Sequence, residues 1–433
     1  MFNKKTIHDI KDVKGKTVLV RADFNVPINE LGVITDDFRI RQALPTIEHL
    51  RAKGAKIVLI SHLGRPSGPG DSSASLLPVS KKLQHLLHLP VQFVDDCVGQ
   101  KPQEVVAKMS EGDILLLENL RFHKEEEQNN REFAQQLAQL ADVFVQDGFG
   151  VVHRAHASTK ATTEFLPSYA GFLLEKEVSF ITKALEDPDR PLAVVIGGAK
   201  ISDKIELLTT LIKKADFVAV VGAMANTFLL AEGVQVGASL VEKDSVSTAR
   251  SILKEAKMRA TKEPFTFYLP EDVVVANKID SKSHTRVVDI SHHTWADINA
   301  YPTQPKKEAY TVASDELILD IGPISAGYIA GALSQARTAI WNGTAGVTEV
   351  EGWHSASRPF SHGTKTISTA LVSSVAGAKN HPFTIVGGGD TVGYVESVDG
   401  LRERFNLVST GGGASLDLMV GKKLPGIEAL QNK

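Results

Sequence analysis

The sequence L-A-V-V-I-G-G at residues 192–198 contains five consecutive apolar residues and ends in two glycines. A strand that is apolar at every position is buried on both faces, which is typical of parallel sheets covered by helices. Ten further runs of this kind occur at 17–24, 56–62, 114–119, 142–149, 217–222, 273–276, 317–322, 338–343, 383–389 and 407–413. Stretches with apolar residues at helical spacing, such as 131–141 and 205–214, lie between them. The sequence therefore predicts an α/β protein with parallel sheets covered by helices.

Eleven predicted strands are too many for one comfortable sheet, so we expect more than one domain. Leu174, Val178, Ile181 and Leu185 form one apolar face of a predicted helix, and prolines at 188 and 191 end that helix. We place the domain boundary at this helix. The alternative is an ordinary surface helix within one large sheet.

The composition of the chain excludes several classes of function. Its 433 residues include 48 Lys and Arg against 51 Asp and Glu, a net charge of −3 at pH 7, which argues against a nucleic-acid coat protein or a polybasic membrane binder. Cys97 is the single cysteine, which excludes an internal disulfide and a zinc site built from cysteines and favours a reducing compartment. Neither a signal-peptide core nor a run of roughly 20 apolar residues is found. We expect a cytoplasmic protein with no nucleic-acid or membrane partner.

Basic side chains follow the predicted strands of the first half. They are Arg21, Arg39, Arg65, Arg121 and Arg154, together with His62, His123, His153 and His156. The carboxyl ends of parallel strands meet at one sheet edge, where these guanidinium groups would repel one another unless an anion lay among them. Guanidinium binds phosphate or carboxylate through two hydrogen bonds and stays charged. This half therefore predicts a site for a small ligand with two or more negative charges.

Glycines follow the predicted strands of the second half. They occur in the segments 197–200, 222–226, 343–346, 387–391 and 411–413. Glycine permits a close approach of the backbone, and a helix that starts there offers free N–H groups to a polyphosphate, so nucleotide binding is favoured. Residues 15–17 resemble the end of a P-loop, but Ile10 occupies the position of the first glycine that this motif needs. No G-x-G-x-x-G occurs, which argues against a nicotinamide dehydrogenase.

Individual side chains in both halves suggest specific chemistry. Lys200 and Lys204 are four residues apart, which predicts that both lie on one face of a helix first turn, where bound phosphate would compensate their unfavourable interaction with the dipole. Asp390 is interpreted as a Mg²⁺ ligand, with a helix N-cap as the alternative. For His153 and His156, anion contact or local hydrogen bonding is favoured over a metal pair. The Cys97 thiolate is disfavoured by Asp95 and Asp96.

Together these segments resemble the phosphoglycerate kinase family along essentially the whole chain. The matching blocks in the first half are R-A-D-F-N-V-P (21–27), D-D-F-R-I (36–40), S-H-L-G-R-P (61–66), L-L-L-E-N-L-R-F-H (115–123) and H-R-A-H-A-S-T (153–159). Those in the second half are G-G-A-K-I-S-D-K-I (197–205), G-A-M-A-N-T-F-L (222–229), L-P-E-D-V-V-V-A (269–276), L-D-I-G-P (319–323), G-G-G-D-T (387–391), S-T-G-G-G-A-S-L (409–416) and G-K-K-L-P-G (421–426).

The resemblance implies two Rossmann-like domains, each a parallel sheet covered by helices, joined by an interdomain helix and hinge. Residues 1–172 with the returning segment 406–433 would bind 3-phosphoglycerate, 173–188 would form the helix, and 189–405 would bind nucleotide. The implied reaction is reversible phosphoryl transfer from 1,3-bisphosphoglycerate to MgADP, giving 3-phosphoglycerate and MgATP. The resemblance further implies a monomer that closes about its hinge.

The resemblance also assigns site residues. Those expected to bind the glycerate substrate are Asp23, Phe24, Asn25, Arg39, His62, Leu63, Gly64, Arg65, Arg121 and Arg154. Those expected to bind the nucleotide are Gly198, Ala199, Lys200, Lys204, Gly222, Asn342, Glu349, Gly388, Gly389, Asp390 and Thr391, with Asp390 on the Mg²⁺. The expected catalytic residues are Arg39, Lys200 and Gly389, of which the two cations would balance charge on the phosphoryl group.

The sequence departs from the family pattern at a few positions, most of them expected around the adenosine pocket. They are Ile318, Ile324, Thr344, Thr348 and the pair Val151-Val152, and residues 281–310 align poorly. A non-catalytic ligand-binding protein on the same scaffold is the alternative, which applies if the altered pocket does not hold nucleotide.

Overall fold

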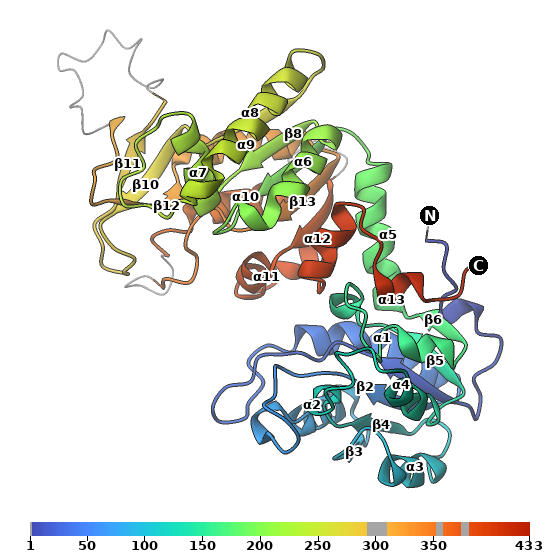
Figure 1. Cartoon of the computed structure of the whole chain (residues 1–433). Helices are drawn as coiled ribbons and strands as arrows, with labels where there is room; N and C mark the ends of the chain where they lie inside the picture. The colour runs from blue at the N-terminus through green and yellow to red at the C-terminus, as the bar shows by residue number, and fades with distance from the viewer. Residues whose placement is uncertain (1, 292–309, 352–357, 374–380) are drawn as a thin grey trace, which may run out of the picture. The chain divides into compact units, whose positions relative to one another are not determined.

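The computed structural model describes residues 2–291, 310–351, 358–373 and 381–433. They form two compact units, the first Met1–Phe180 with Thr410–Lys433 and the second Ile181–Ser409 (Figure 1). The boundary falls within helix α5 (Phe172–Glu186). Most of the poorly aligning segment 281–310 lies outside the described residues. No helix among the described residues is long and apolar enough to cross a membrane.

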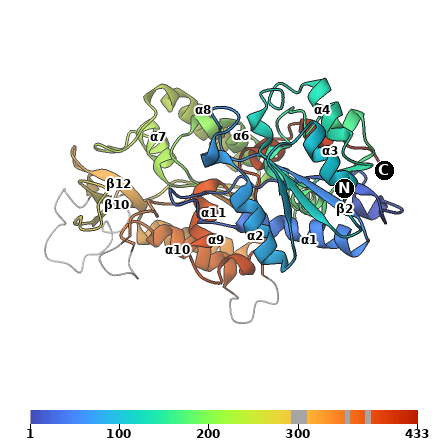
Figure 2. The ribbon, with the colours of Figure 1, turned by 90° about the horizontal axis from the view of Figure 1, so that it is seen from below.

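The first unit contains a six-stranded parallel sheet with the order β3-β4-β2-β1-β5-β6. Its strands are β1 (Thr17–Arg21), β2 (Lys56–Ile60), β3 (Gln92–Val94), β4 (Ile114–Leu117), β5 (Val143–Gln146) and β6 (Ser168–Ala170). Helices α1 (Phe38–Ala52) and α2 (Leu77–Leu87) cover one face, and α3 (Gln100–Ala107) and α4 (Arg131–Ala138) cover the other (Figure 2).

Alternation along β1 explains this two-sided burial. Val18 and Val20 pack in the core formed with α1 and α2, whereas Leu19 packs in the core that contains Phe133 of α4. Successive side chains of a strand point to opposite faces, so both faces need apolar residues. The continuous apolar runs therefore correctly indicated parallel sheets covered by helices.

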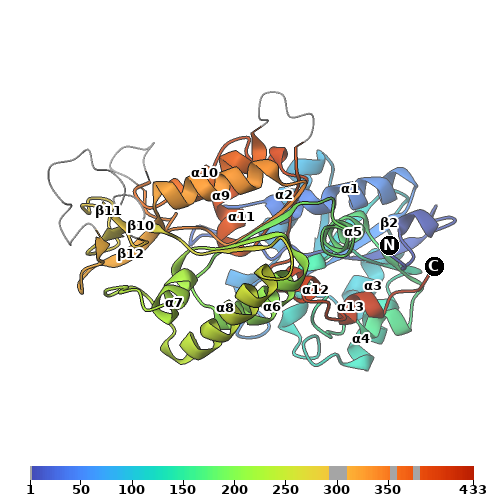
Figure 3. The ribbon, with the colours of Figure 1, turned by 90° about the horizontal axis from the view of Figure 1, so that it is seen from above.

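The second unit contains another six-stranded parallel sheet, with the order β15-β14-β13-β7-β8-β9. Its strands are β7 (Leu192–Ile196), β8 (Phe217–Val220), β9 (Thr266–Tyr268), β13 (Thr338–Asn342), β14 (Phe383–Gly387) and β15 (Leu407–Val408). Helices α9 (Pro323–Gln335) and α10 (His362–Val372) lie on one face, and α6 (Ile205–Lys214), α7 (Ala223–Ala231) and α8 (Val246–Ala260) lie on the other (Figure 3). Short helices follow later in the chain: α11 (Gly389–Glu396), α12 (Gly413–Met419) and α13 (Pro425–Glu428).

Two of the predicted strands are not parallel. Strands β10 (Asp272–Ala276) and β12 (Leu317–Ile321) flank each other in a separate antiparallel sheet of order β11-β10-β12, with β11 spanning Arg286–Asp289. The connection from β10 to β11 is shorter than the dozen or so residues that a parallel crossover needs, so the chain returns as a hairpin. A short apolar run does not indicate whether a strand pairs parallel or antiparallel to its neighbour.

The predicted interdomain helix is observed as α5. All four residues of its predicted apolar face, Leu174, Val178, Ile181 and Leu185, are buried. The four strands that sequence analysis missed, β3, β6, β9 and β11, have only three or four residues each. Each of them is only partly buried, so they lack the continuous apolar run that identified the other strands.

Candidate active site

Each six-stranded sheet has one point where neighbouring strands lead to opposite sides. In the first sheet this point lies between β1 and β5, because β1 connects towards β2 and β5 towards β6. In the second sheet it lies between β7 and β13 for the same reason. Ligands of open α/β sheets bind beyond the carboxyl ends of the strands at such points. Most of the predicted site residues lie in the loops that follow strands of these two sheets.

In the first unit, the loop after β1 carries a buried carboxylate that is paired with an arginine. Asp23 is buried, and its Oδ2 accepts a hydrogen bond of 2.6 Å from Nη1 of Arg39, near the start of α1. The Arg39 side chain is 31% exposed, so part of its guanidinium group remains available to a ligand. The Nδ1 atom of His62, after β2, lies 3.8 Å from Asp23 Oδ1.

Four of the five arginines predicted to share one sheet edge act on one residue, His62. Burial lowers the pKa of His62 well below its usual value, and the charges of Arg21, Arg121, Arg39 and Arg154 lower it further. His62 is therefore neutral at pH 7. We call Arg39, Arg65, Arg121 and Arg154 the arginine cluster; Arg65 belongs to it because its charge acts on Arg121. A neutral, buried imidazole within four cations is suited to an anionic ligand.

Arg21 is not one of the ligand-facing arginines that the sequence predicted. It is fully buried, its Nε donates to Ser158 Oγ at 2.9 Å, and its Nη2 lies 3.2 Å from His62 Nδ1. The third contact is to the carbonyl of Ala22. Arg21 is the last residue of β1 and points to the same side as Leu19, into the protein. Arg21 therefore contacts the His62 ring from within the protein and does not face the ligand site.

The loop after β2 is held in place by main-chain and side-chain hydrogen bonds. Gly64 has a φ of 59°, its N–H donates to Asn25 Oδ1 at 2.8 Å, and its carbonyl accepts from Arg121 Nη1 at 2.7 Å. Leu63 N–H donates to Asn119 Oδ1 at 3.2 Å. Burial lowers the pKa of Arg121, and Arg154 and Arg65 add to this. These bonds connect the loops that follow β1, β2 and β4.

Two of the predicted substrate residues offer only main-chain atoms. The side chains of Phe24 and Leu63 are buried in the apolar core of the first unit. Phe24 N–H donates to Ser61 Oγ at 2.8 Å. Arg65, by contrast, is exposed, and Arg154 is partly buried, with its Nε donating to His153 Nε2 at 3.2 Å.

Glu126 is a buried residue of this region that sequence analysis missed. Its carboxylate accepts 2.9 and 2.6 Å hydrogen bonds from Ser158 N and Oγ and lies 3.8 Å from His156 Nδ1. Burial raises the pKa of Glu126, while Arg21 opposes the rise. Burial and the nearby Arg121 lower the pKa of His156 to about 4. In sequence Glu126 belongs to a run of three glutamates, a pattern that usually indicates a solvated face.

The second unit contains a cavity of about 160 Å³, which we call the glycine cavity. Of the predicted nucleotide residues it is lined by Gly198, Ala199, Gly222, Glu349 and Asp390. Its apolar lining includes Ile318, which was expected near the adenosine pocket. It also includes residues that were not assigned from the sequence: Leu229, Pro270, Val273, Leu319, Ile321 and Val347. The cavity thus combines glycine loops with an apolar wall, which suits a molecule with both phosphates and a flat base.

Lys200 and Lys204 do not share the first turn of a helix. Residues Ser202–Lys204 form a 3-10 turn, and α6 begins only at Ile205. Lys200 precedes this turn and is exposed. Lys204 Nζ donates to Gly197 O at 2.5 Å, to Asn342 Oδ1 at 2.7 Å and to Asn342 O at 3.2 Å. Burial lowers its pKa to about 8, and Asp390 acts against this.

The loops after β7 and β13 contact each other through glycine. Gly197 N–H donates to Asn342 O at 2.8 Å, and a Cβ on Gly197 would lie 2.3 Å from Thr344 O. A side chain at this position would therefore separate the two loops. Nδ2 of the buried Asn342 has no hydrogen-bond partner among the described residues, so a donor is left over beside Lys204.

The glycine-rich loop after β14 leads directly into α11. Gly388, with a φ of 89°, is the N-cap residue, so the alternative interpretation of Asp390 as the N-cap is wrong. Asp390 lies in the first turn, is exposed, and lines the glycine cavity, whereas Gly389 is exposed beside it. Thr391 is buried, and its Oγ1 accepts a 2.6 Å hydrogen bond from Gly343 N–H. Thr391 therefore holds two loops together.

One buried carboxylate lines the glycine cavity in addition to the exposed Asp390 and Glu349. Asp320, at the end of β12, accepts hydrogen bonds of 2.9 Å from the N–H groups of Gly363 and Ile321. Burial raises its pKa to about 7. Sequence analysis placed this aspartate only within the matching block 319–323.

Only some departures from the family pattern lie at the glycine cavity. Ile318 and Thr344 line it. Thr348 is buried outside the lining, Ile324 on α9 is 43% exposed, and Val151 and Val152 are buried in the first unit. The expectation that most departures surround this pocket is therefore only partly met.

Comparisons with known proteins agree along the whole chain. A family model described as phosphoglycerate kinase matches residues 7–422. The phosphoglycerate kinase of Moorella thermoacetica is 46% identical over 430 residues, covering 99% of this chain and 100% of the relative. That of Dictyoglomus turgidum is 43% identical over 432 residues, with 99% and 100% coverage. The solved structure of phosphoglycerate kinase from Coxiella burnetii superposes with a TM-score of 0.80 at 34% identity and covers 98% of both chains.

Proposed function

The chain belongs to the phosphoglycerate kinase family, and we propose that the arginine cluster and the glycine cavity divide that family's reaction between them. The protein is a glycolytic kinase that transfers a phosphoryl group between 1,3-bisphosphoglycerate and ADP, giving 3-phosphoglycerate and ATP. The arginine cluster holds the glycerate substrate, and the glycine cavity holds the nucleotide. The alternative of a non-catalytic binding protein has no observation in its favour.

The assignment of the glycerate substrate depends on charge. This substrate carries a carboxylate and a phosphate, and the four guanidinium groups of the arginine cluster, three of which act on His62, provide matching positive charge. Asp23 and Asn25 complete the site: Asp23 orients Arg39, and Asn25 orients Gly64. The main chain at Phe24, Leu63 and Gly64 supplies further polar groups. The arginine cluster is the observation that carries the proposed function.

The assignment of the nucleotide depends on the two faces of the glycine cavity. Backbone N–H groups at Gly198, Gly222 and the start of α11 suit the phosphates, and Lys204 beside Asn342 adds a cation. Glu349, exposed at the cavity, is assigned to the ribose side, next to the apolar wall.

Catalysis by these residues consists of positioning and charge stabilisation. The attacking group, a carboxylate or a terminal phosphate, is already ionised at pH 7, so no general base is required. The transition state of phosphoryl transfer spreads negative charge over the transferred group, and Arg39 and Lys200 are proposed to stabilise it. Gly389 leaves the backbone accessible next to this group, because nothing lies within 4 Å of its Cβ position. In-line transfer also requires that water be excluded while donor and acceptor meet.

The residues present fit a Mg²⁺ ion bound together with the nucleotide. Asp390 offers an exposed carboxylate to the glycine cavity, at the first turn of α11. Proteins hold Mg²⁺ through one or two carboxylates, with the remaining ligands from phosphates and water. When bound, the ion would neutralise phosphate charge and orient the nucleotide.

The domain roles and the cellular setting follow from these assignments. We propose that residues 1–172 with 406–433 bind the glycerate, that 173–188 form the connecting helix, and that 189–405 bind the nucleotide. We further propose that the protein is a cytoplasmic monomer; size-exclusion chromatography with light scattering tests the monomer.

A coupled assay with 3-phosphoglycerate and MgATP tests the proposed function. We expect turnover by the purified, folded protein, and calorimetry should show binding of MgADP and of 3-phosphoglycerate separately. Binding of both ligands without turnover would favour the non-catalytic alternative, and absence of nucleotide binding would refute the role of the glycine cavity.

A further inference from the structure

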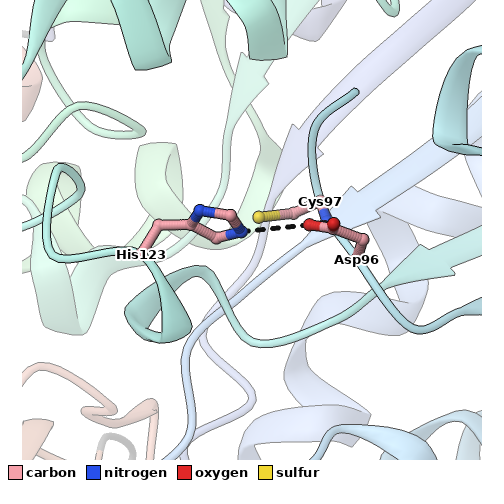
Figure 4. Close-up of side chains that lie close together, drawn as sticks. All are labelled: Asp96, Cys97 and His123. Atoms are coloured by element: carbon pink, nitrogen blue, oxygen red, sulfur yellow. Dashed lines mark hydrogen bonds and ion pairs between the residues drawn. The ribbon is translucent and has the colours of Figure 1, made fainter. Parts of the chain in front are cut away.

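Three side chains of types that bind transition metals lie together in the first unit, outside the arginine cluster. Asp96 and Cys97 occupy the loop between β3 and α3, and His123 directly follows the 3-10 helix Leu120–Phe122. One ligand atom from each residue lies within 4.8 Å of the other two. Figure 4 shows the Cys97 sulfur beside the His123 ring, with Asp96 facing the same ring. Cys97 and His123 are 26 residues apart in sequence, so only folding brings the three side chains together.

We propose that Asp96, Cys97 and His123 bind a divalent transition-metal ion of the Zn²⁺ class. Thiolate, imidazole and carboxylate together are ligands of Zn²⁺, whereas Mg²⁺ and Ca²⁺ prefer oxygen ligands alone. Three protein ligands leave a fourth tetrahedral position for water. This site is separate from the proposed Mg²⁺ position at Asp390 and does not depend on the proposed function.

The distances require only a small contraction around an ion. Nε2 of His123 lies 3.0 Å from Oδ1 of Asp96, where a proton now lies between them. Ligand atoms around tetrahedral Zn²⁺ are separated by roughly 3.3 to 3.7 Å, as the metal–ligand lengths imply. The Asp96 and His123 atoms would separate by a few tenths of an ångström as the ion replaces the shared proton, and the sulfur would move inward by about 1 Å at most.

The Cys97 thiol is the second observation that indicates a ligand. Cys97 is fully buried, and no other described residue is a hydrogen-bond partner of its sulfur. The loop itself is already ordered, because Asp96 Oδ1 accepts the Cys97 N–H at 2.7 Å. A bound dication would give the sulfur a partner without a rearrangement of the backbone.

The electrostatic surroundings favour a cation over a free thiolate. Burial raises the pKa of Cys97 well above its usual value, and the negative charges of Asp96, Glu126 and Glu118 raise it further. The same three carboxylates attract a dication.

An ion has a route to the site and a structural consequence once bound. The side chains of Asp96 and His123 are 45% and 28% exposed, so solvent reaches two of the three ligands. His123 also packs against Phe133 of α4, with ring centroids 5.1 Å apart. The ion would therefore connect the β3–α3 loop to the segment that precedes α4 and stabilise the first unit.

Titration of the full-length protein with Co²⁺ in thiol-free buffer tests the proposal. We expect thiolate-to-cobalt charge-transfer absorption in the wild type, none in Cys97→Ala, and at least about tenfold weaker binding in His123→Gln. His85→Ala is the matched control, because His85 and His88 form an exposed pair, with ring centroids 6.2 Å apart, that could bind metal adventitiously. This control should behave like the wild type. Saturating Zn²⁺ should raise the melting temperature of the wild type and His85→Ala but not of Cys97→Ala.

Several outcomes would overturn the proposal. No charge-transfer absorption in the wild type, or equal affinity in His123→Gln, would exclude the site, as would loss of binding in His85→Ala alone. If Cys97→Ala fails to fold, ¹¹³Cd NMR of the wild type replaces it. A resonance in the range of one-sulfur coordination supports the site, and a resonance typical of oxygen and nitrogen ligands only refutes it.

Discussion

Replacing Arg39 with alanine tests the arginine cluster most directly. Arg39 is the partner of Asp23, with 2.6 Å between Nη1 and Oδ2, and its remaining donors are proposed to stabilise the transferred phosphoryl group. Removal of one donor that stabilises transition-state charge lowers kcat by about 10² to 10³. We expect a loss of this size in the coupled assay at saturating substrates.

The same substitution has a stability effect that can be separated from catalysis. Asp23 has a side chain only 2% exposed, and without Arg39 it keeps just a 3.3 Å hydrogen bond from the Asn25 N–H. An incompletely satisfied buried group costs about 1 to 3 kcal/mol. For a unit of roughly 200 residues this lowers the melting temperature by about 3 °C per kcal/mol, so the fold survives at assay temperature. Adding Asp23→Asn should recover stability but not turnover.

Arg41 provides a matched control on the same helix. It is 47% exposed and pairs with Asp37 at 2.7 Å, away from His62, so Arg41→Ala should keep its kcat and change stability by less than about 0.5 kcal/mol. Arg39→Lys should restore only part of the activity, because lysine lacks the planar fork. A kcat of Arg39→Ala within about threefold of the wild type, or an equal loss in Arg41→Ala, would refute the reasoning.

Four further predictions concern single residues. The pKa of Lys204 is lowered to about 8, so KM for the nucleotide should rise as the pH passes 8, and Lys204→Met should abolish this dependence in steady-state kinetics. Asp147, which caps α5, has a pKa raised to about 7 by burial; the wild type should lose stability as the pH rises from about 4 to 7, and urea unfolding of Asp147→Asn should show a smaller loss. Asp390→Ala should raise KM for the Mg-nucleotide without lowering the melting temperature; unchanged kinetics would contradict the metal assignment. Gly197→Ala should melt several degrees lower because its Cβ would overlap Thr344 O, whereas Gly327→Ala, inside α9 with free space around it, should be stabilising by about 0.5 to 1 kcal/mol.

Local patterns in the sequence were enough to predict the fold class, and they indicated the sheet edges that we propose as ligand sites. Continuous apolar runs indicated helix-covered parallel sheets, and the spacing of Leu174, Val178, Ile181 and Leu185 indicated α5. Arginines after the strands of the first half indicated an anion site. These inferences are possible from sequence because burial on both faces, helical periodicity and the common edge of parallel strands all leave patterns in short segments.

Contacts between distant segments were decided only by the tertiary structure. Arg21 and Arg39 look alike in sequence, but Arg21 points to the same side of β1 as Leu19, is fully buried, and contacts His62 instead of a ligand. Lys204 became a partly buried donor because the loops after β7 and β13 meet beside it, while Lys200 stayed exposed. Cys97 came into contact with His123 because β3 and β4 are neighbours in the sheet, so the segments that follow them lie side by side. Periodicity describes which face of its own element a residue occupies, whereas its partners depend on strand order and loop paths that no short segment encodes.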